Sequence, residues 1–332
     1  MKKALVMVLT LAMVLALCAC GQQAAPAAPA ASTGSASSGD ATPAEGGLKI
    51  GFCASDSTNP VFIKCENWLT EQCAKDGNTL MTQYFETDSS KFLDICENFI
   101  TAQCDIMIVQ DPDEQISDDV LGRAQEAGII VCTLDTDNPH STYVQKDQNG
   151  EAGHLLASVI IDYINNNLGG SAKMVSYACP QSETMKVRNE VIAEDVIAAC
   201  PGSEVVVEID VWNVNADWVG LGETSLQAAP DAYVIYSVAD VCTLGALEAY
   251  KAQGKTSADG YAAFSFDATA AACEEMQQEG SILNTSIYMG YPDVVAKMYT
   301  AAVQTAKTGE VGERYCAAEL LPVNASNAAE IN

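Results

Sequence analysis

The stretch Leu48–Lys64, LKIGFCASDSTNPVFIK, decides how the rest of the chain is interpreted. Its first part, up to Cys53, is an apolar run with the length and flanks of a buried strand. Polar residues follow as far as Asn59, and Pro60 then stands at the first turn of a helix, where no backbone N–H is needed. This strand, loop and helix predict an open α/β sheet, in which ligands bind where strand ends meet helix starts.

The same alternation of short apolar runs and helical patterns continues along the chain. Runs such as 105–110 are bounded by polar turns, which is typical of parallel strands covered on both faces. The expected strands are 48–54, 79–85, 105–110, 129–134, an edge strand or crossover at 142–146, 172–178, 204–210, 232–237, 260–266, 281–286 and 315–321. The expected helices are 60–76, 89–103, 115–127, 149–167, 182–199, 215–228, 239–253, 268–278 and 292–308. Successive right-handed βαβ units of this kind predict two doubly wound parallel-sheet lobes, with a ligand cleft between their strand ends.

Composition narrows the classes of partner. The 332 residues suffice for two α/β lobes, and 48% hydrophobic with 18% charged residues is an ordinary globular balance. The formal net charge of −28 repels phosphates, so nucleic acid is a poor partner and we expect none. Arginine occurs only at positions 123, 188 and 314, so an arginine within a motif is informative.

The N-terminus indicates export. Lys2 and Lys3 precede a short apolar segment, which is the pattern of a secretory signal and is short for a membrane span. Leu17-Cys18-Ala19-Cys20 resembles a bacterial lipobox, in which Cys20 becomes the first mature residue and carries a diacylglycerol. Residues 1–20 are therefore expected to be a lipoprotein signal peptide, with a plain signal peptide cut nearby as the alternative. Residues 21–47 lack bulky apolar side chains and are expected to be a flexible linker spanning roughly 30 Å.

Thirteen cysteines are many for an exported protein. Removal of Cys18 and lipidation of Cys20 leave an odd number, from Cys53 to Cys316, with no C-x-x-C pair. We expect most of these residues to be small buried hydrophobic groups, with a disulfide framework as the alternative. Their redox state stays open at this point.

Motifs spread over some 270 residues resemble those of a known family. They are Asn59-Pro60-Val61-Phe62, Thr133-Leu134-Asp135, Arg188, Asp240 with Leu244 to Ala249 and Gly254-Lys255, Phe266-Asp267 and Tyr291-Pro292-Asp293. In order and spacing they resemble the type I periplasmic binding proteins, which are the ribose- and galactose-type sugar-binding proteins of ABC importers. The resemblance implies that the last helix returns to the first lobe and the tail to the second, which makes a three-crossing hinge. It thus implies a first lobe of 48–148 plus 291–312 and a second lobe of 149–290 plus 313–332.

The resemblance also implies a function. The chain is expected to be a monomeric solute-binding protein that captures a small hydroxyl-rich ligand, by preference a sugar, for an ABC permease and its ATPase. A lipid anchor would hold it at the extracellular face of the cell membrane, or in the periplasm of a Gram-negative cell. The first alternative is a ligand-binding co-receptor for a sensor kinase or chemoreceptor.

Candidate ligand residues follow from the chemistry of a sugar. Its hydroxyls donate and accept, so the site needs carboxylates, amides and arginine, with aromatic faces for the C–H patches. Strand ends, the first loop and the second lobe's first motif supply Asn59, Phe62, Gln110, Asp135, Arg188 and Asp267. By the resemblance, Trp212 matches an aromatic stacking position.

Each candidate has a structural alternative. Asn59 is also placed to cap the helix, and both roles are compatible. The two carboxylates could be loop residues, Arg188 a solvated helix residue, and Phe62 and Trp212 core residues. Gln110 precedes Asp111-Pro112-Asp113, which could form only a turn.

Three departures from the family pattern leave the ligand open. Thr136, Ala239 and Met289 or Gly290 stand where the resemblance implies Arg, Asn and Gln. A deoxy sugar, a nucleoside, an autoinducer-like furanosyl compound and another small polyol all remain candidates. We expect a neutral ligand because two carboxylates accompany one arginine.

No motif predicts catalysis. The sequence holds only two histidines, His140 and His154, and no G-x-S-x-G, P-loop or metal-ligand spacing. We therefore expect a non-enzymatic receptor without cofactor or metal. A surface glycosidase or esterase is the remaining alternative.

Overall fold

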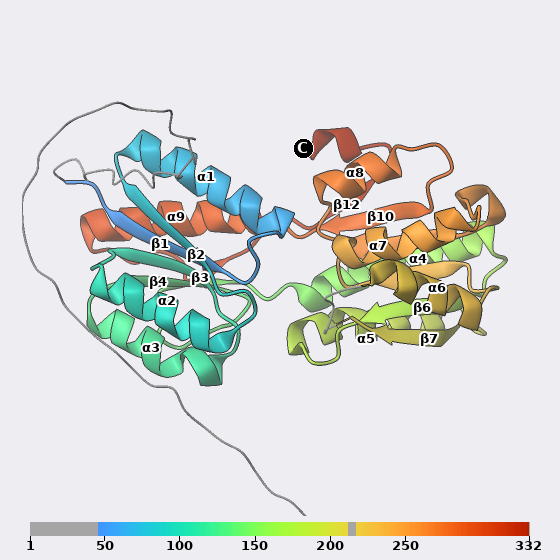
Figure 1. The fold of residues 1–332 in the computed structure, drawn as a ribbon, viewed down its shortest axis with the longest axis horizontal. Helices are drawn as coiled ribbons and strands as arrows, with labels where there is room; N and C mark the ends of the chain where they lie inside the picture. Colours follow the sequence, from blue (N-terminus) through green and yellow to red (C-terminus); the bar gives the residue numbers. More distant parts are fainter. Residues whose placement is uncertain (1–45, 212–216, 332) are drawn as a thin grey trace, which may run out of the picture. The chain divides into compact units, whose positions relative to one another are not determined.

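Two six-stranded sheets are present in the part of the chain that the structure describes. The structure, a computed structural model, describes residues 46–211 and 217–331, apart from the side chains of residues 183 and 184. The description below concerns the compact unit formed by residues 42–332. The expected two-lobed fold is confirmed, with one sheet in each lobe (Figure 1).

The first lobe is built on a sheet with the strand order β11-β5-β4-β3-β1-β2. All its neighbouring strands pair in parallel. Its elements are β1 (Lys49–Ala54), α1 (Pro60–Asp76), β2 (Thr79–Tyr84), α2 (Ser89–Thr101), β3 (Ile106–Gln110), α3 (Glu114–Glu126), β4 (Ile130–Leu134), β5 (Tyr143–Gln145), α9 (Tyr291–Thr308) and β11 (Tyr315–Cys316).

Helices cover both faces of this sheet, as the apolar strands require. Phe52 packs with the buried residues of α1 and α9, and its neighbour Cys53 packs with those of α2 and α3. Successive side chains of a strand point to opposite faces, so one short apolar run serves two cores. Figure 1 shows α1 and α9 on one side of the sheet and α2 and α3 on the other.

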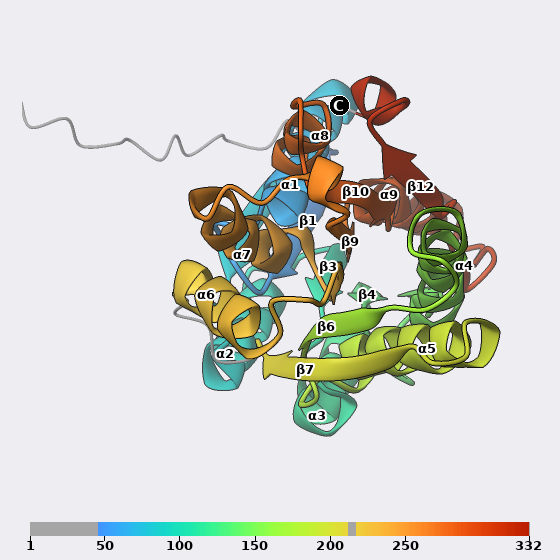
Figure 2. The ribbon, with the colours of Figure 1, turned by 90° about the vertical axis from the view of Figure 1, so that its right-hand side faces the viewer.

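The second lobe repeats this plan with the strand order β12-β10-β9-β8-β6-β7. Only β12 runs antiparallel to its neighbour among the described strands. Its elements are α4 (Asn149–Asn167), β6 (Lys173–Ala178), α5 (Glu183–Ala199), β7 (Glu204–Asp210), α6 (Trp218–Ala228), β8 (Val234–Ser237), α7 (Asp240–Ala252), η1 (Ser257–Asp259), β9 (Ala262–Phe266), α8 (Ala270–Met276), β10 (Leu283–Tyr288), β12 (Leu321–Asn324) and η2 (Ala328–Glu330). Buried residues of α4 and α5 form the core on one face, and those of α6, α7 and α8 form the core on the other (Figure 2).

The described chain passes between the lobes three times: from β5 to α4, from β10 to α9 and from β11 to β12. The crossings contact one another. The Gln148 side chain donates to the Ala318 carbonyl at 3.2 Å and accepts from the Ala318 amide at 3.0 Å. Gly290 adopts φ 65°, and a Cβ there would lie 2.3 Å from Ala318 Cβ.

The expected boundary between 312 and 313 is wrong. The strand expected at 315–321 is two short strands, and β11 pairs in parallel with β5 at the edge of the first sheet. The Val144 amide donates to the Arg314 carbonyl, and the Lys146 amide donates to the Cys316 carbonyl, both at 2.8 Å. Because this edge offers unpaired backbone groups, the chain adds a strand to the first sheet before it crosses to the second lobe.

All eleven described cysteines are free and buried, as expected for small hydrophobic side chains. Burial raises the pKa of the Cys53 and Cys65 thiols to about 12, which keeps both in the unreactive protonated form. None of the described helices has the length and apolarity needed to cross a bilayer.

Candidate ligand-binding site

The first-lobe side of the candidate site lies at the carboxyl ends of β3 and β4. The Gln110 side chain donates to Asp135 Oδ2 at 2.7 Å and accepts from the Ser55 amide at 2.8 Å. Asp135 adopts φ 69° immediately after β4, and its amide donates to Gln145 Oε1 at 3.1 Å. The amide of Gln110 thus fixes the Asp135 carboxylate at the sheet edge that faces the hinge.

The second-lobe side places a cation beside a carboxylate. Arg188, 4% exposed on α5, donates through Nε to Asn149 Oδ1 at 2.6 Å and through NH1 to the Val238 carbonyl at 3.0 Å. Its guanidinium lies 4.9 Å from the centre of the Phe266 ring, and Asp267 directly follows that ring at the end of β9. These contacts fix the position of Arg188 before any ligand arrives.

Charged groups of both lobes shift the pKa of the same buried carboxyl group. Burial raises the pKa of the Asp267 carboxyl, the nearby Arg188 lowers it, and the charge of Asp135 raises it again. Asp240 at the start of α7 is fully buried, and it accepts from the Thr269 amide and the Ser286 hydroxyl, each at 2.7 Å. Burial and the charge of Asp267 raise the pKa of Asp240. A ligand hydroxyl here would meet acidic acceptors from both lobes and one fixed cationic donor.

Tyr291, which the sequence analysis did not select, lies between these groups. It is the first residue of α9, and its hydroxyl donates to Asp135 Oδ1. Its ring meets the Phe62 ring edge-on at a centroid distance of 6.0 Å. Burial and the Asp135 charge raise the pKa of the Tyr291 phenol well above its ordinary value, while Arg188 lowers it. The only sequence signal was its place directly before Pro292, where a polar ligand residue was sought one or two positions earlier.

Asn59, Phe62 and Trp212 are the three remaining predicted ligand residues. Asn59 caps α1, because its Oδ1 accepts from the Val61 amide at 2.9 Å. Phe62 is 5% exposed in the first-lobe core and reaches the site through its edge contact with Tyr291. Trp212 lies outside the described residues, as do Cys20 and the expected signal peptide and linker up to residue 45.

A cavity of about 270 Å³ opens beside the polar groups. The first lobe lines it with Val61, Ile63 and the stem of Lys64, and the second lobe with Asp267 and Ala270. A much smaller cavity, of about 10 Å³, is lined by Asp135 and hinge residues, and Tyr291 lines both cavities. The larger cavity combines an apolar wall with a carboxylate, which suits a small amphipathic molecule.

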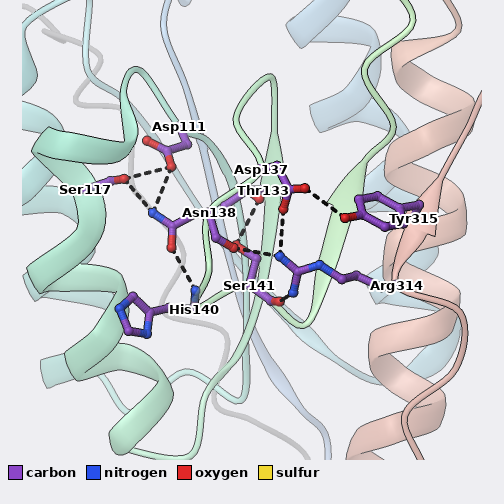
Figure 3. Close-up of polar contacts among 9 residues, drawn as sticks. All are labelled: Asp111, Ser117, Thr133, Asp137, Asn138, His140, Ser141, Arg314 and Tyr315. Carbon is purple, nitrogen blue, oxygen red and sulfur yellow. Dashed lines mark hydrogen bonds and ion pairs between the residues drawn. The ribbon is translucent and has the colours of Figure 1, made fainter.

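A buried polar network supports the loop that follows Asp135 (Figure 3). Asp111 is 1% exposed, and it accepts from Ser117 Oγ at 2.7 Å and from Asn138 Nδ2 at 3.3 Å. Arg314, in the C-terminal segment, hydrogen-bonds to the same loop. It donates to Asp137 Oδ1 at 2.7 Å, to the Asn138 carbonyl at 2.9 Å and to the Ser141 carbonyl. The network ties the loop after β4 to the segment that leads to the last crossing.

Residues 50–310 match the model of the periplasmic binding protein domain. The chain belongs to this family. The expected resemblance to type I sugar-binding proteins is thereby confirmed. The ribose import binding protein of Bacillus subtilis (strain 168) is 25% identical to this periplasmic binding protein over 262 residues, which cover 77% of this chain and 79% of that one.

Solved structures confirm the fold of this periplasmic binding protein. A galactofuranose binding protein superposes with a TM-score of 0.76 at 18% identity, covering 85% of this chain and 96% of the other. An ABC transporter solute binding protein from Bacillus halodurans C-125, solved with myo-inositol, has a TM-score of 0.75 at 23% identity, covering 87% and 98%. Within the described residues, no group of His, Cys, Asp and Glu side chains is arranged to hold a metal ion.

Proposed function

We propose that the protein captures a small, neutral, hydroxyl-rich molecule outside the cell and delivers it to an ABC importer. The observation that carries the proposal is the convergence of Asp135 from the first lobe with Arg188 and Asp267 from the second, around Tyr291 at the hinge. A hydroxyl is the group that satisfies both a carboxylate acceptor and a guanidinium donor. A ligand that contacts both sides would hold the lobes together, and hinge bending then distinguishes the loaded form from the empty one.

The charges favour a neutral ligand. Two carboxylates and one guanidinium give the site a net negative charge when all three groups are ionised, which repels carboxylated and phosphorylated molecules. The apolar wall formed by Val61, Ile63 and Ala270 suits the C–H faces of a sugar or polyol. The ribose import binding protein among the relatives and the bound myo-inositol in a similar fold agree with this class.

A thermal-shift screen of pentoses, hexoses, nucleosides and polyols tests the proposal. At least one of these compounds should raise the melting temperature of the wild type. Asp267→Ala and Arg188→Ala should each cost about 2–5 kcal/mol of binding, because truncation leaves a buried polar partner unpaired. A screen in which only carboxylated or phosphorylated compounds stabilise the protein would refute the proposed ligand class.

Asp231→Ala is the matched control. Asp231 is also a second-lobe carboxylate, but it forms an exposed pair with Lys173 at 2.7 Å and does not line either cavity described above. An exposed pair contributes little to stability, and its loss should leave ligand affinity unchanged. An equal loss of affinity in Asp231→Ala and Asp267→Ala would mean that the effect is not specific to the site.

The proposal includes anchoring through a lipid on Cys20, which would place the ligand site at the outer surface of the membrane. Cells fed a labelled fatty acid should label the wild type and leave Cys20→Ser unlabelled. The variant should also leave the membrane fraction. A labelled Cys20→Ser protein would refute this part of the proposal and leave the ligand class untouched.

A further inference from the structure

The hydroxyl of Tyr291 occupies one of the acceptor positions on Asp135 that a ligand hydroxyl could use. Gln110 already donates to Asp135 Oδ2 at 2.7 Å, and Tyr291 donates to Oδ1. Both carboxylate oxygens therefore have a donor from the chain itself. The aromatic ring of Tyr291 likewise rests against Phe62, the ring that the sequence analysis expected a sugar to meet.

Tyr291 lies where a ligand in the larger cavity would contact it. Its ring is only partly buried and lines the cavity of about 270 Å³ on one side. Gly290 precedes it with φ 65°, the start of α9 has no side-chain cap, and the Tyr291 side chain packs against buried residues of both lobes.

We propose that Tyr291 is an affinity- and specificity-determining residue that acts as an internal competitor for Asp135. A polyol binds only when one of its hydroxyls replaces the phenol on Asp135. This inference rests on the proposed function, since it concerns the same site and ligand class. The exchange favours ligands whose hydroxyl, together with contacts to Arg188 and Asp267, outweighs the lost phenol bond. Molecules that reach only the first lobe gain nothing from the exchange.

Tyr291→Phe tests the competition because it keeps the ring against Phe62 and removes only the hydroxyl. The probes are D-ribose and myo-inositol, titrated calorimetrically into the full protein. Hydrogen bonds to charged groups are the stronger kind. A ligand no longer has to displace the Tyr291 hydroxyl from the Asp135 carboxylate in this variant, so its binding should tighten by about tenfold. Weaker binding would overturn the proposal, because the hydroxyl would then be a direct ligand contact. An unchanged dissociation constant would overturn it too.

Tyr84→Phe is the matched control. The Tyr84 hydroxyl also donates to a carboxylate of the first lobe, Glu66 Oε2, at 2.7 Å, but it does not line either cavity. Its removal should lower the stability of the protein and leave the dissociation constant of either probe unchanged. Equal tightening in both variants would overturn the proposal, because it would trace the effect to a general loosening of the lobe.

A ligand-free measurement separates failure of this inference from failure of the proposed function. With ¹³C-labelled tyrosine, the Tyr291 phenol resonance is the signal that Tyr291→Phe removes. In the empty protein the phenol should titrate well above its ordinary pKa, because it is buried and lies beside the Asp135 charge, and added probe should shift the resonance. Titration of the phenol at its ordinary pKa would overturn the inference even if sugars bind. If neither the wild type nor Tyr291→Phe binds either probe or any compound of the screen, both the polyol function and the exchange fail.

Discussion

Gly290→Ala should destabilise the protein through two separable effects. Gly290 has φ 65°, a left-handed conformation that costs an L-residue roughly 1–2 kcal/mol. The added Cβ would also lie 2.3 Å from Ala318 Cβ, where the second and third crossings pack together. Overpacking of a tight contact typically costs about 1–3 kcal/mol. We therefore expect the free energy of unfolding to fall by about 2–5 kcal/mol.

Gly309→Ala isolates the backbone effect. Gly309 has φ 74°, and a Cβ there would have no heavy atom within 4 Å. It should therefore cost about 1–2 kcal/mol. Both substitutions restrict the unfolded chain equally, so this contribution cancels in the comparison. Urea unfolding followed by circular dichroism and by tryptophan fluorescence measures both variants, with coincident transitions as the check for two-state behaviour. If Gly290→Ala is no more destabilising than Gly309→Ala, the crossings are not tightly packed at Ala318.

Three further outcomes are expected. Arg314→Gln should lower the free energy of unfolding by about 1–3 kcal/mol and speed amide exchange in 135–142, because it removes charge-assisted bonds to buried carbonyls. Arg123→Gln, which breaks exposed pairs with Glu97 and Asp119, should change the free energy of unfolding little, and an equal effect of the two substitutions would contradict the role of Arg314. Burial raises the pKa of Asp111 to about 6. Between about pH 4 and 6 the carboxyl therefore carries a proton in the folded protein that it has lost in the unfolded chain. The contribution of the Asp111 carboxyl to the free energy of unfolding is therefore fully present below about pH 4. It is lost as pH rises through 6, by on the order of 2–3 kcal/mol. Asp111→Asn should flatten that decline in urea titrations at several pH values, and an unaltered slope would exclude Asp111 as its source. Finally, the eleven buried thiols should react with a thiol reagent only after unfolding, and a denatured protein with almost no free thiol would contradict the assignment.

Local sequence rules predicted most of the first lobe because its signals lie within a few residues of one another. Pro60 begins α1, Asn59 caps it, and the apolar runs become the strands covered on both faces. Asn59 illustrates the limit of such rules. Capping and ligand binding call for the same amide at the same position, and the structure displays the capping bond without excluding the other role.

Contacts between residues far apart in the chain could not be predicted from local sequence patterns. The hydroxyl of Tyr291 meets Asp135 across 156 positions, and no local pattern reports such a pair. The pairing of β11 with β5 likewise depends on an open sheet edge formed some 170 residues earlier, which composition does not encode. Asp135, Arg188 and Asp267 were selected individually, from strand ends and a scarce residue type. Their electrostatic coupling emerged only once the two sheets were built.

The late strands β11 and β12 have a consequence for biosynthesis. Each completes the edge of a different sheet, although the two lie within ten residues of each other near the end of the chain. Because these two strands are made one after the other, the two sheets receive their edge strands within the same short interval of synthesis. Removal of residues 315–324 would take the edge strands β11 and β12 from both sheets at once.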